Sequence, residues 1–256
     1  MFLLLHISHF VYIFFFILGW SLGEHQEWSK YSNYEVSLKV PLIVHVPGLT
    51  NKDKKPFKYT PVLDFISLNN TYFSEASNVS SSDIHPQYVS EELIELVDIF
   101  PTLANITGIS VPPLCRLYPT PLCSEGINFY PVIKHHVSES KADFTWKTGA
   151  FSQYPRPSVN IQLNSDQPKL EDIHIMGYSI RTGRFRYTEW VSFNNTICKP
   201  EWHNVVAQEL YDHKYDPFEV YNLYNAAVYN NTVKELSKKI KRGWRHALPP
   251  DLFGSS

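Results

Sequence analysis

Residues 176–193, MGYSIRTGRFRYTEWVSF, predict a β-hairpin. Two runs rich in aromatic and β-branched residues flank Thr182-Gly183, a pair suited to a tight turn. Residues 144–152 and 201–224 predict further strands, the second of which ends in a loop. Together these segments predict a small antiparallel sheet.

Two helices are expected beside this sheet. Residues 232–244 predict a basic amphipathic helix whose KKIKR face is expected to be a solvated surface. Residues 90–104 predict a second helix, capped by Ser90 and interrupted at Pro101, because proline lacks a backbone donor. Residues 36–48 predict one more strand. Strands with helices on one side indicate an α+β domain.

Composition indicates a folded protein and excludes a general nucleic-acid binder. The chain has 256 residues, of which 43% are hydrophobic and 15% aromatic, enough to build a core. The formal net charge is −2, so no overall positive field would attract nucleic acid.

Residues 1–19 form an apolar run without Lys, Arg, Asp or Glu. Two interpretations stay open. The run has the length of a signal-peptide core or a short membrane anchor, which predicts membrane contact. It lacks a basic start and a small-residue cleavage site, however, and its Phe- and Ile-rich composition also suits a strand packed against the domain.

Cysteines and glycosylation sequons point to an oxidising compartment. Cys115 and Cys123 flank the segment RLYPTPL at a spacing that a small disulfide loop can close. This pairing gives the third cysteine, Cys198, no partner in the sequence. No second Cys/His pair lies at zinc-ligand spacing. Asn-x-Ser/Thr sequons predict glycosylation in the secretory or lysosomal pathway at Asn69, Asn78, Asn105, Asn194 and Asn230.

Several separated motifs resemble the sulfatase family, which has an alkaline-phosphatase-like fold. They are GWSLGEHQEWSKYSNYEVSLKVPLIVHVPG (19–48), ELVDIFPTLANITGI (95–109) and ELYDHKYDPFEVYNL (209–223). SQYPRPS, NSDQP and IMGYSIRTGRFRYTEW are similar to the members that act on 2-sulfated iduronate. The resemblance implies the carboxyl-terminal part of that fold, α/β to α+β. The expected divisions are an apolar segment at 1–19, the end of the catalytic α/β core at 20–110 and a carboxyl-terminal subdomain at 111–256.

The resemblance also implies that catalytic parts of the family are missing here. Family members carry Ser-Asp-His before the Gly-Trp pair, with the aspartate binding calcium. Ile17 and Leu18 stand at the Asp-His positions and cannot ligate a hard cation, so the family's calcium cofactor has no ligands in this chain. None of the three cysteines lies in the C-x-P-S-R motif that yields the formylglycine nucleophile. We therefore expect no turnover by this chain without an amino-terminal sulfatase half.

The substrate-facing residues of the family have counterparts. Lys30 aligns with the lysine that contacts the sulfate, although an ordinary exposed lysine is the alternative. Trp20 is expected in the pocket wall or in the core. Gln167 replaces a lysine suited to the sugar carboxylate, and Lys169 is expected to compensate in part. Arg181 is a candidate sulfate ligand, together with two arginines of the same hairpin whose alternative is a solvated strand face.

Three functional hypotheses follow from the resemblance. The first is a sulfuric ester hydrolase that removes 2-O-sulfate from iduronate in heparan or dermatan sulfate, of which this chain is a part. The second is an inactive sulfatase-like protein that binds sulfated glycosaminoglycan. The third is an incomplete product without an independent role.

Overall fold

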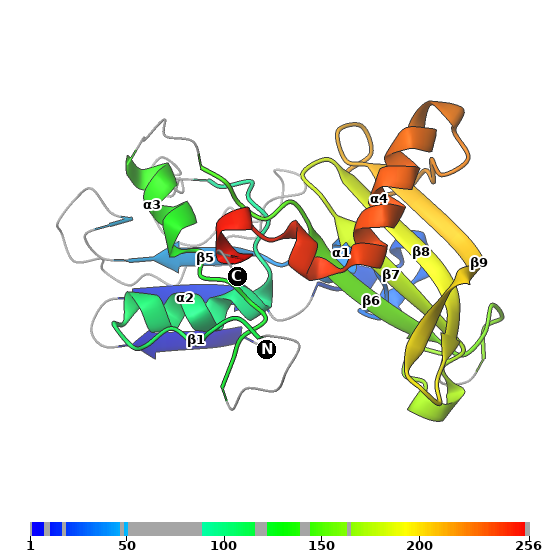
Figure 1. The fold of residues 1–256 in the computed structure, drawn as a ribbon, viewed down its shortest axis with the longest axis horizontal. Coiled ribbons are helices and arrows are strands. Elements are labelled where there is room, and N and C mark those ends of the chain that lie inside the picture. The colour runs from blue at the N-terminus through cyan, green and yellow to red at the C-terminus, as the bar shows by residue number, and fades with distance from the viewer. Residues whose placement is uncertain are drawn as a thin grey trace, which may run out of the picture.

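The computed structural model describes residues 2–7, 11–16, 19–46, 49–50, 89–115, 122–138, 144–162 and 165–253. They form two bodies, one built on a four-stranded sheet and the other on a three-stranded sheet, and a short two-stranded sheet pairs β3 with β4 (Figure 1). The predictions for Ile17, Leu18, Asn69 and Asn78 lie outside the described residues.

The larger sheet has four antiparallel strands in the order β6-β7-β8-β9. β7 and β8 form the predicted hairpin, with Arg181 opposite Arg186 next to the turn. The pattern of alternating aromatic and β-branched residues is therefore confirmed as a hairpin, and so is the small antiparallel sheet that the sequence predicts. The strand bounds are Ala150–Arg156 for β6, Ile175–Arg181 for β7, Phe185–Asn194 for β8 and Lys199–Asp212 for β9.

Helix α4, Asn230–Arg242, lies across one face of this sheet (Figure 1). Leu236 and Ile240 pack against buried side chains of β7, β8 and β9. Burying each such side chain stabilises the fold by about 1.5–3 kcal/mol. The predicted helix is confirmed with its start two residues earlier, and its last predicted residue, Trp244, belongs to a separate 3₁₀ turn.

The segment 19–38 contacts the opposite face of the same sheet. Asn33 donates its side-chain amide to the carbonyl of Gly177 in β7 at 3.1 Å. A side chain at Gly177 would lie 2.6 Å from the Trp190 ring, so glycine permits the Trp190 ring to cover this position. The elements here are β3 (Ser21–Leu22), η1 (Glu24–Gln26), β4 (Trp28–Ser29) and α1 (Glu35–Leu38).

The three-stranded sheet has the order β1-β2-β5 and is antiparallel. β1 spans Phe2–Ile7, β2 spans Val11–Phe16 and β5 spans Leu42–His45. The described residues of the amino-terminal run are therefore strands, in agreement with the second of its two interpretations. The prediction of a strand throughout 36–48 is wrong, because Glu35–Leu38 form the short helix α1, closed by the hydrogen bond from the Lys39 amide to the Glu35 carbonyl at 2.7 Å.

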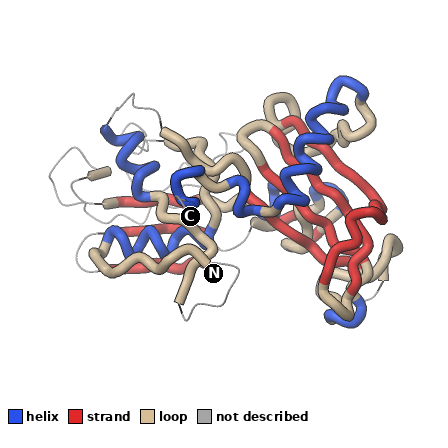
Figure 2. Tube along the Cα trace, viewed as in Figure 1, coloured by secondary structure: helices blue, strands red, loops and turns tan. Residues whose placement is uncertain are grey.

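Helices α2 (Ile99–Ile106) and α3 (Tyr130–Ser138) belong to the same body (Figure 2). The helix predicted from Ser90 begins later, at the 3₁₀ turn Leu96–Asp98, where Glu95 and Asp98 form a capping box. Pro101 does not interrupt α2. It stands in the first turn, whose amides have no acceptor within the helix, so the missing donor costs nothing.

Further 3₁₀ helices span Leu170–Asp172, Ala227–Tyr229, Trp244–Ala247 and Pro250–Phe253. Within the described parts of the chain, each helix is too short or too polar to cross a membrane.

Candidate functional site

Tyr31 contacts Gln167, the candidate for binding the sugar carboxylate, and follows the candidate sulfate contact Lys30 in the chain. The side-chain amide of Gln167 donates a hydrogen bond to the Tyr31 hydroxyl, across 136 residues of sequence. The Lys30 ammonium lies 6.0 Å from the centroid of the Tyr31 ring. Tyr31 therefore links two loops that the sequence separates widely, and it was not singled out in the sequence analysis.

The other predicted residues of this region are exposed. Trp20 has 53% of its surface exposed, so it is not a core residue among the described side chains. The Lys169 ammonium lies 3.8 Å from a Glu171 carboxylate oxygen, with both side chains largely exposed. An ion pair of this kind contributes little to stability, so Lys169 can exchange Glu171 for a ligand at low cost.

Arg181 faces a carboxylate of the chain itself. Its Nε donates to Glu35 Oε2 at 3.2 Å, and the buried Arg186 donates to the same oxygen. Arg186 Nε also donates to Glu219 Oε1 at 2.6 Å. Burial alone would raise the pKa of Glu35, but the two guanidinium groups outweigh it and hold that pKa below its ordinary value. His213 completes this cluster through Nε2, 2.7 Å from Glu219 Oε1.

The alternative of a solvated arginine face on the hairpin is wrong for Arg186, whereas Arg184 is exposed. Arg186 is only 3% exposed, because its guanidinium lies between Glu35 and Glu219. Arg184 lies in the turn and makes two hydrogen bonds to the Asp212 carboxylate. The motif 209–223 thus supplies carboxylates that bind two of the three arginines.

Glu35, His213 and Glu219 are also close enough together to hold a metal ion. Their oxygens, however, already accept from Arg181 and Arg186, whose positive charges would repel a cation. Calcium requires six to eight oxygen ligands, as a rule. This cluster, the one such group in the described residues, does not fit the calcium ion that the family resemblance implies.

A pocket of about 270 Å³ opens beside the segment 32–34. Arg156 of the SQYPRPS motif lines it, with its guanidinium carbon 5.5 Å from the Trp190 ring centroid and Nη2 3.0 Å from Glu27 Oε1. Trp190 in turn donates to Glu209 at 2.6 Å. The motif was recognised from the sequence, but Arg156 was not identified as a pocket residue because its partners come from other motifs.

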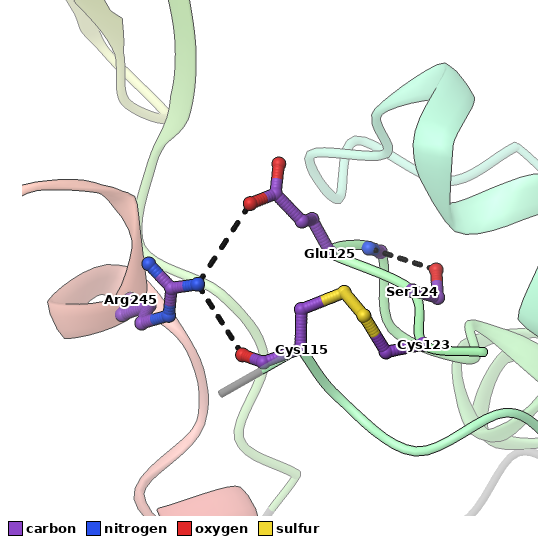
Figure 3. The surroundings of a disulfide bond; sticks show 6 residues. Cys115, Cys123, Ser124, Glu125 and Arg245 are labelled. Atoms are coloured by element: carbon purple, nitrogen blue, oxygen red, sulfur yellow. Dashed lines mark hydrogen bonds and ion pairs between the residues drawn. A yellow bond between two sulfur atoms is a disulfide. The ribbon is translucent and has the colours of Figure 1, made fainter. Parts of the chain in front are cut away.

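Cys115 and Cys123 form the predicted disulfide (Figure 3). Arg245 Nη2 donates to the Cys115 carbonyl at 3.2 Å and lies 3.7 Å from Glu125, which ties this loop to the segment after α4 (Figure 3). Cys198 is free and exposed. Of the three predicted glycosylation sites that are described, Asn105 and Asn230 are exposed and Asn194 is half-buried.

Comparison with known proteins relates the chain to sulfatases, while no family model matches it. It is 43% identical to iduronate 2-sulfatase of Homo sapiens over 81% of this chain and 37% of the relative. It is 39% identical to iduronate 2-sulfatase of Mus musculus over 85% of this chain and 39% of the relative. The chain therefore spans less than two fifths of the length of these relatives.

Solved structures share the fold at lower identity. A 2-O glycosaminoglycan sulfatase matches with a TM-score of 0.55 and 18% identity, over 96% of this chain and 38% of the other. A protein in complex with its substrate D-glucosamine-2-N,6-O-disulfate also matches with a TM-score of 0.55, at 19% identity, over 96% of this chain and 36% of the other. At these identities the likeness shows the fold alone.

Proposed function

We propose that this chain, a homologue of the iduronate 2-sulfatases with the fold of the sulfatases, forms the substrate-facing part of a sulfuric ester hydrolase. The substrate proposed is 2-sulfated iduronate in heparan or dermatan sulfate. The observation that carries the proposal is the hydrogen bond between Gln167 and Tyr31, which joins the Gln167 loop to the residue that follows Lys30.

The proposed roles follow from the chemistry of these side chains. Lys30 supplies a positive charge to the sulfate oxygens, where a fixed cation stabilises charge that develops during transfer. The exposed ring of Trp20 offers an apolar surface to the sugar. Gln167 donates a hydrogen bond to the sugar carboxylate but supplies no charge, and the weakly paired Lys169 lies two residues away.

The nucleophile and the metal are proposed to come from elsewhere than this chain. Cys115 and Cys123 are held in a disulfide and cannot act as a nucleophile. Cys198 is followed by Lys-Pro-Glu rather than the family motif. The chain alone is therefore expected to bind sulfated sugar without hydrolysing it. The disulfide and the exposed sequons support the proposed secretory or lysosomal location.

The experiment combines a turnover assay with a binding titration on the purified chain. A fluorogenic iduronate-2-sulfate substrate is expected to give no turnover, and a 2-sulfated iduronate disaccharide is expected to bind with a millimolar Kd, that is, about −4 kcal/mol. Lys30→Ala should weaken binding by about 1 kcal/mol, or roughly fivefold, whereas the exposed control Lys39→Ala should not. Equal affinity of the two variants would contradict the proposed site.

A further inference from the structure

The outward face of α4 carries a row of positive charges. Lys234, Lys238 and Arg242 follow one another at four-residue spacing, so they form a stripe with about 6 Å between successive positions. All three side chains are exposed, and the exposed Lys239 lies beside the stripe. This surface, the α4 basic face, consists of these four residues.

These charges are not used by the fold. Among the described residues, no carboxylate forms an ion pair with any member of the α4 basic face. Two cations near this face, in contrast, have carboxylate partners. Lys241 pairs with the buried Glu189 at 3.0 Å, and Arg245 lies 3.7 Å from Glu125. The structure therefore separates cations that stabilise the fold from four that remain available to an anion.

The shape of the helix favours a charged polymer over a lipid surface. The apolar residues Leu236 and Ile240 are buried against the sheet. A helix that lies in a membrane interface turns a broad apolar face toward the acyl chains, and the α4 basic face has none to offer. Clusters of five to eight residues rich in Lys and Arg are typical of heparin and nucleic-acid patches, and KKIKR is such a cluster.

We propose that the α4 basic face binds a sulfated glycosaminoglycan chain as a second contact, separate from the Lys30 region. The proposal rests on the proposed function, which supplies the class of polyanion. α4 packs on the face of the sheet that carries Tyr187. The next residue along β8, Arg186, points to the other face, toward Glu35 in the segment 19–38. A disaccharide held by Lys30 therefore does not reach α4, but a longer chain that bends around the edge of the sheet does.

The test compares two variants of equal charge on the full chain. Lys234→Gln, Lys238→Gln and Arg242→Gln together remove the stripe, whereas Lys39→Gln, Lys134→Gln and Lys199→Gln remove three exposed lysines elsewhere. Binding of a heparan sulfate dodecasaccharide is measured over a range of salt concentrations. The stripe variant is expected to weaken binding by about tenfold or more at low salt, and to flatten the slope of log K against log salt by about two to three. The control variant is expected to change the affinity and the salt slope much less.

Three outcomes would overturn the proposal. They are equal losses in the two variants, equal or tighter binding of a DNA oligonucleotide of matched charge, and binding of phosphatidylserine vesicles that depends on the stripe. Circular dichroism of both variants checks that they fold. Disaccharide affinity should depend on Lys30 and not on the stripe, so failure of the proposed function and failure of this inference give different results.

Discussion

Replacing Arg186 by methionine should destabilise the chain by about 3–5 kcal/mol, the usual cost of removing one partner from a buried ion pair. Arg186 is 3% exposed and Glu219 is 1% exposed, so water cannot solvate the carboxylate that loses its partner. Methionine keeps most of the length of arginine, which limits any cavity. Since small domains are stable by about 5–15 kcal/mol, the expected loss is a large share of the total.

Urea denaturation followed by tryptophan fluorescence measures this loss. Arg242→Met serves as the control, because Arg242 is exposed without an ion partner among the described residues, and it should change stability by less than about 0.5 kcal/mol. Adding Glu35→Gln to Arg186→Met removes one of the two carboxylate charges that pair with Arg186. The double variant should therefore lose about 1–3 kcal/mol less than the sum of the single variants. A loss below about 1 kcal/mol for Arg186→Met would refute the reasoning.

The same cluster predicts how stability depends on pH. The pKa of Glu35 is lowered in the folded state from its ordinary value of 4.5, since Arg186 and Arg181 outweigh the effect of burial. The stabilising contribution is therefore present above pH 4.5 and is lost as pH falls through the lowered pKa. In Arg186→Met this acid-induced loss should be smaller, and an unchanged pH profile would speak against the assignment.

Two further predictions concern local structure. Cys115→Ala with Cys123→Ala opens a loop with a sequence separation of 8 and should cost about 2.5 kcal/mol in urea denaturation, while non-reducing peptide mapping of the unaltered chain should recover the linked pair. Gly126→Ala would place a carbon 2.0 Å from the Val97 carbonyl oxygen and should cost about 1–3 kcal/mol, whereas Gly183→Ala meets nothing within 4 Å and should be nearly neutral. Equal thermal stability of the two glycine variants would contradict that contact.

The sequence by itself determined the local elements and the family resemblance. The hairpin at 176–193 follows from alternation around a turn pair, and α4 follows from apolar residues at helical spacing. The Cys115–Cys123 disulfide follows from short spacing. Each of these depends on residues close together in the chain. The sequence did not predict the helix at Glu35–Leu38, because its apolar residues also fit the pattern of a strand.

Only the tertiary structure decided which charges are free. Arg186 and Glu35 lie 151 residues apart, and Gln167 and Tyr31 lie 136 apart. No local pattern distinguishes Arg186, buried between carboxylates, from Arg242, exposed without an ion partner among the described residues. The physical reason is that a charge can be buried only where packing of distant segments supplies its partner, and sheet register and helix docking determine that packing.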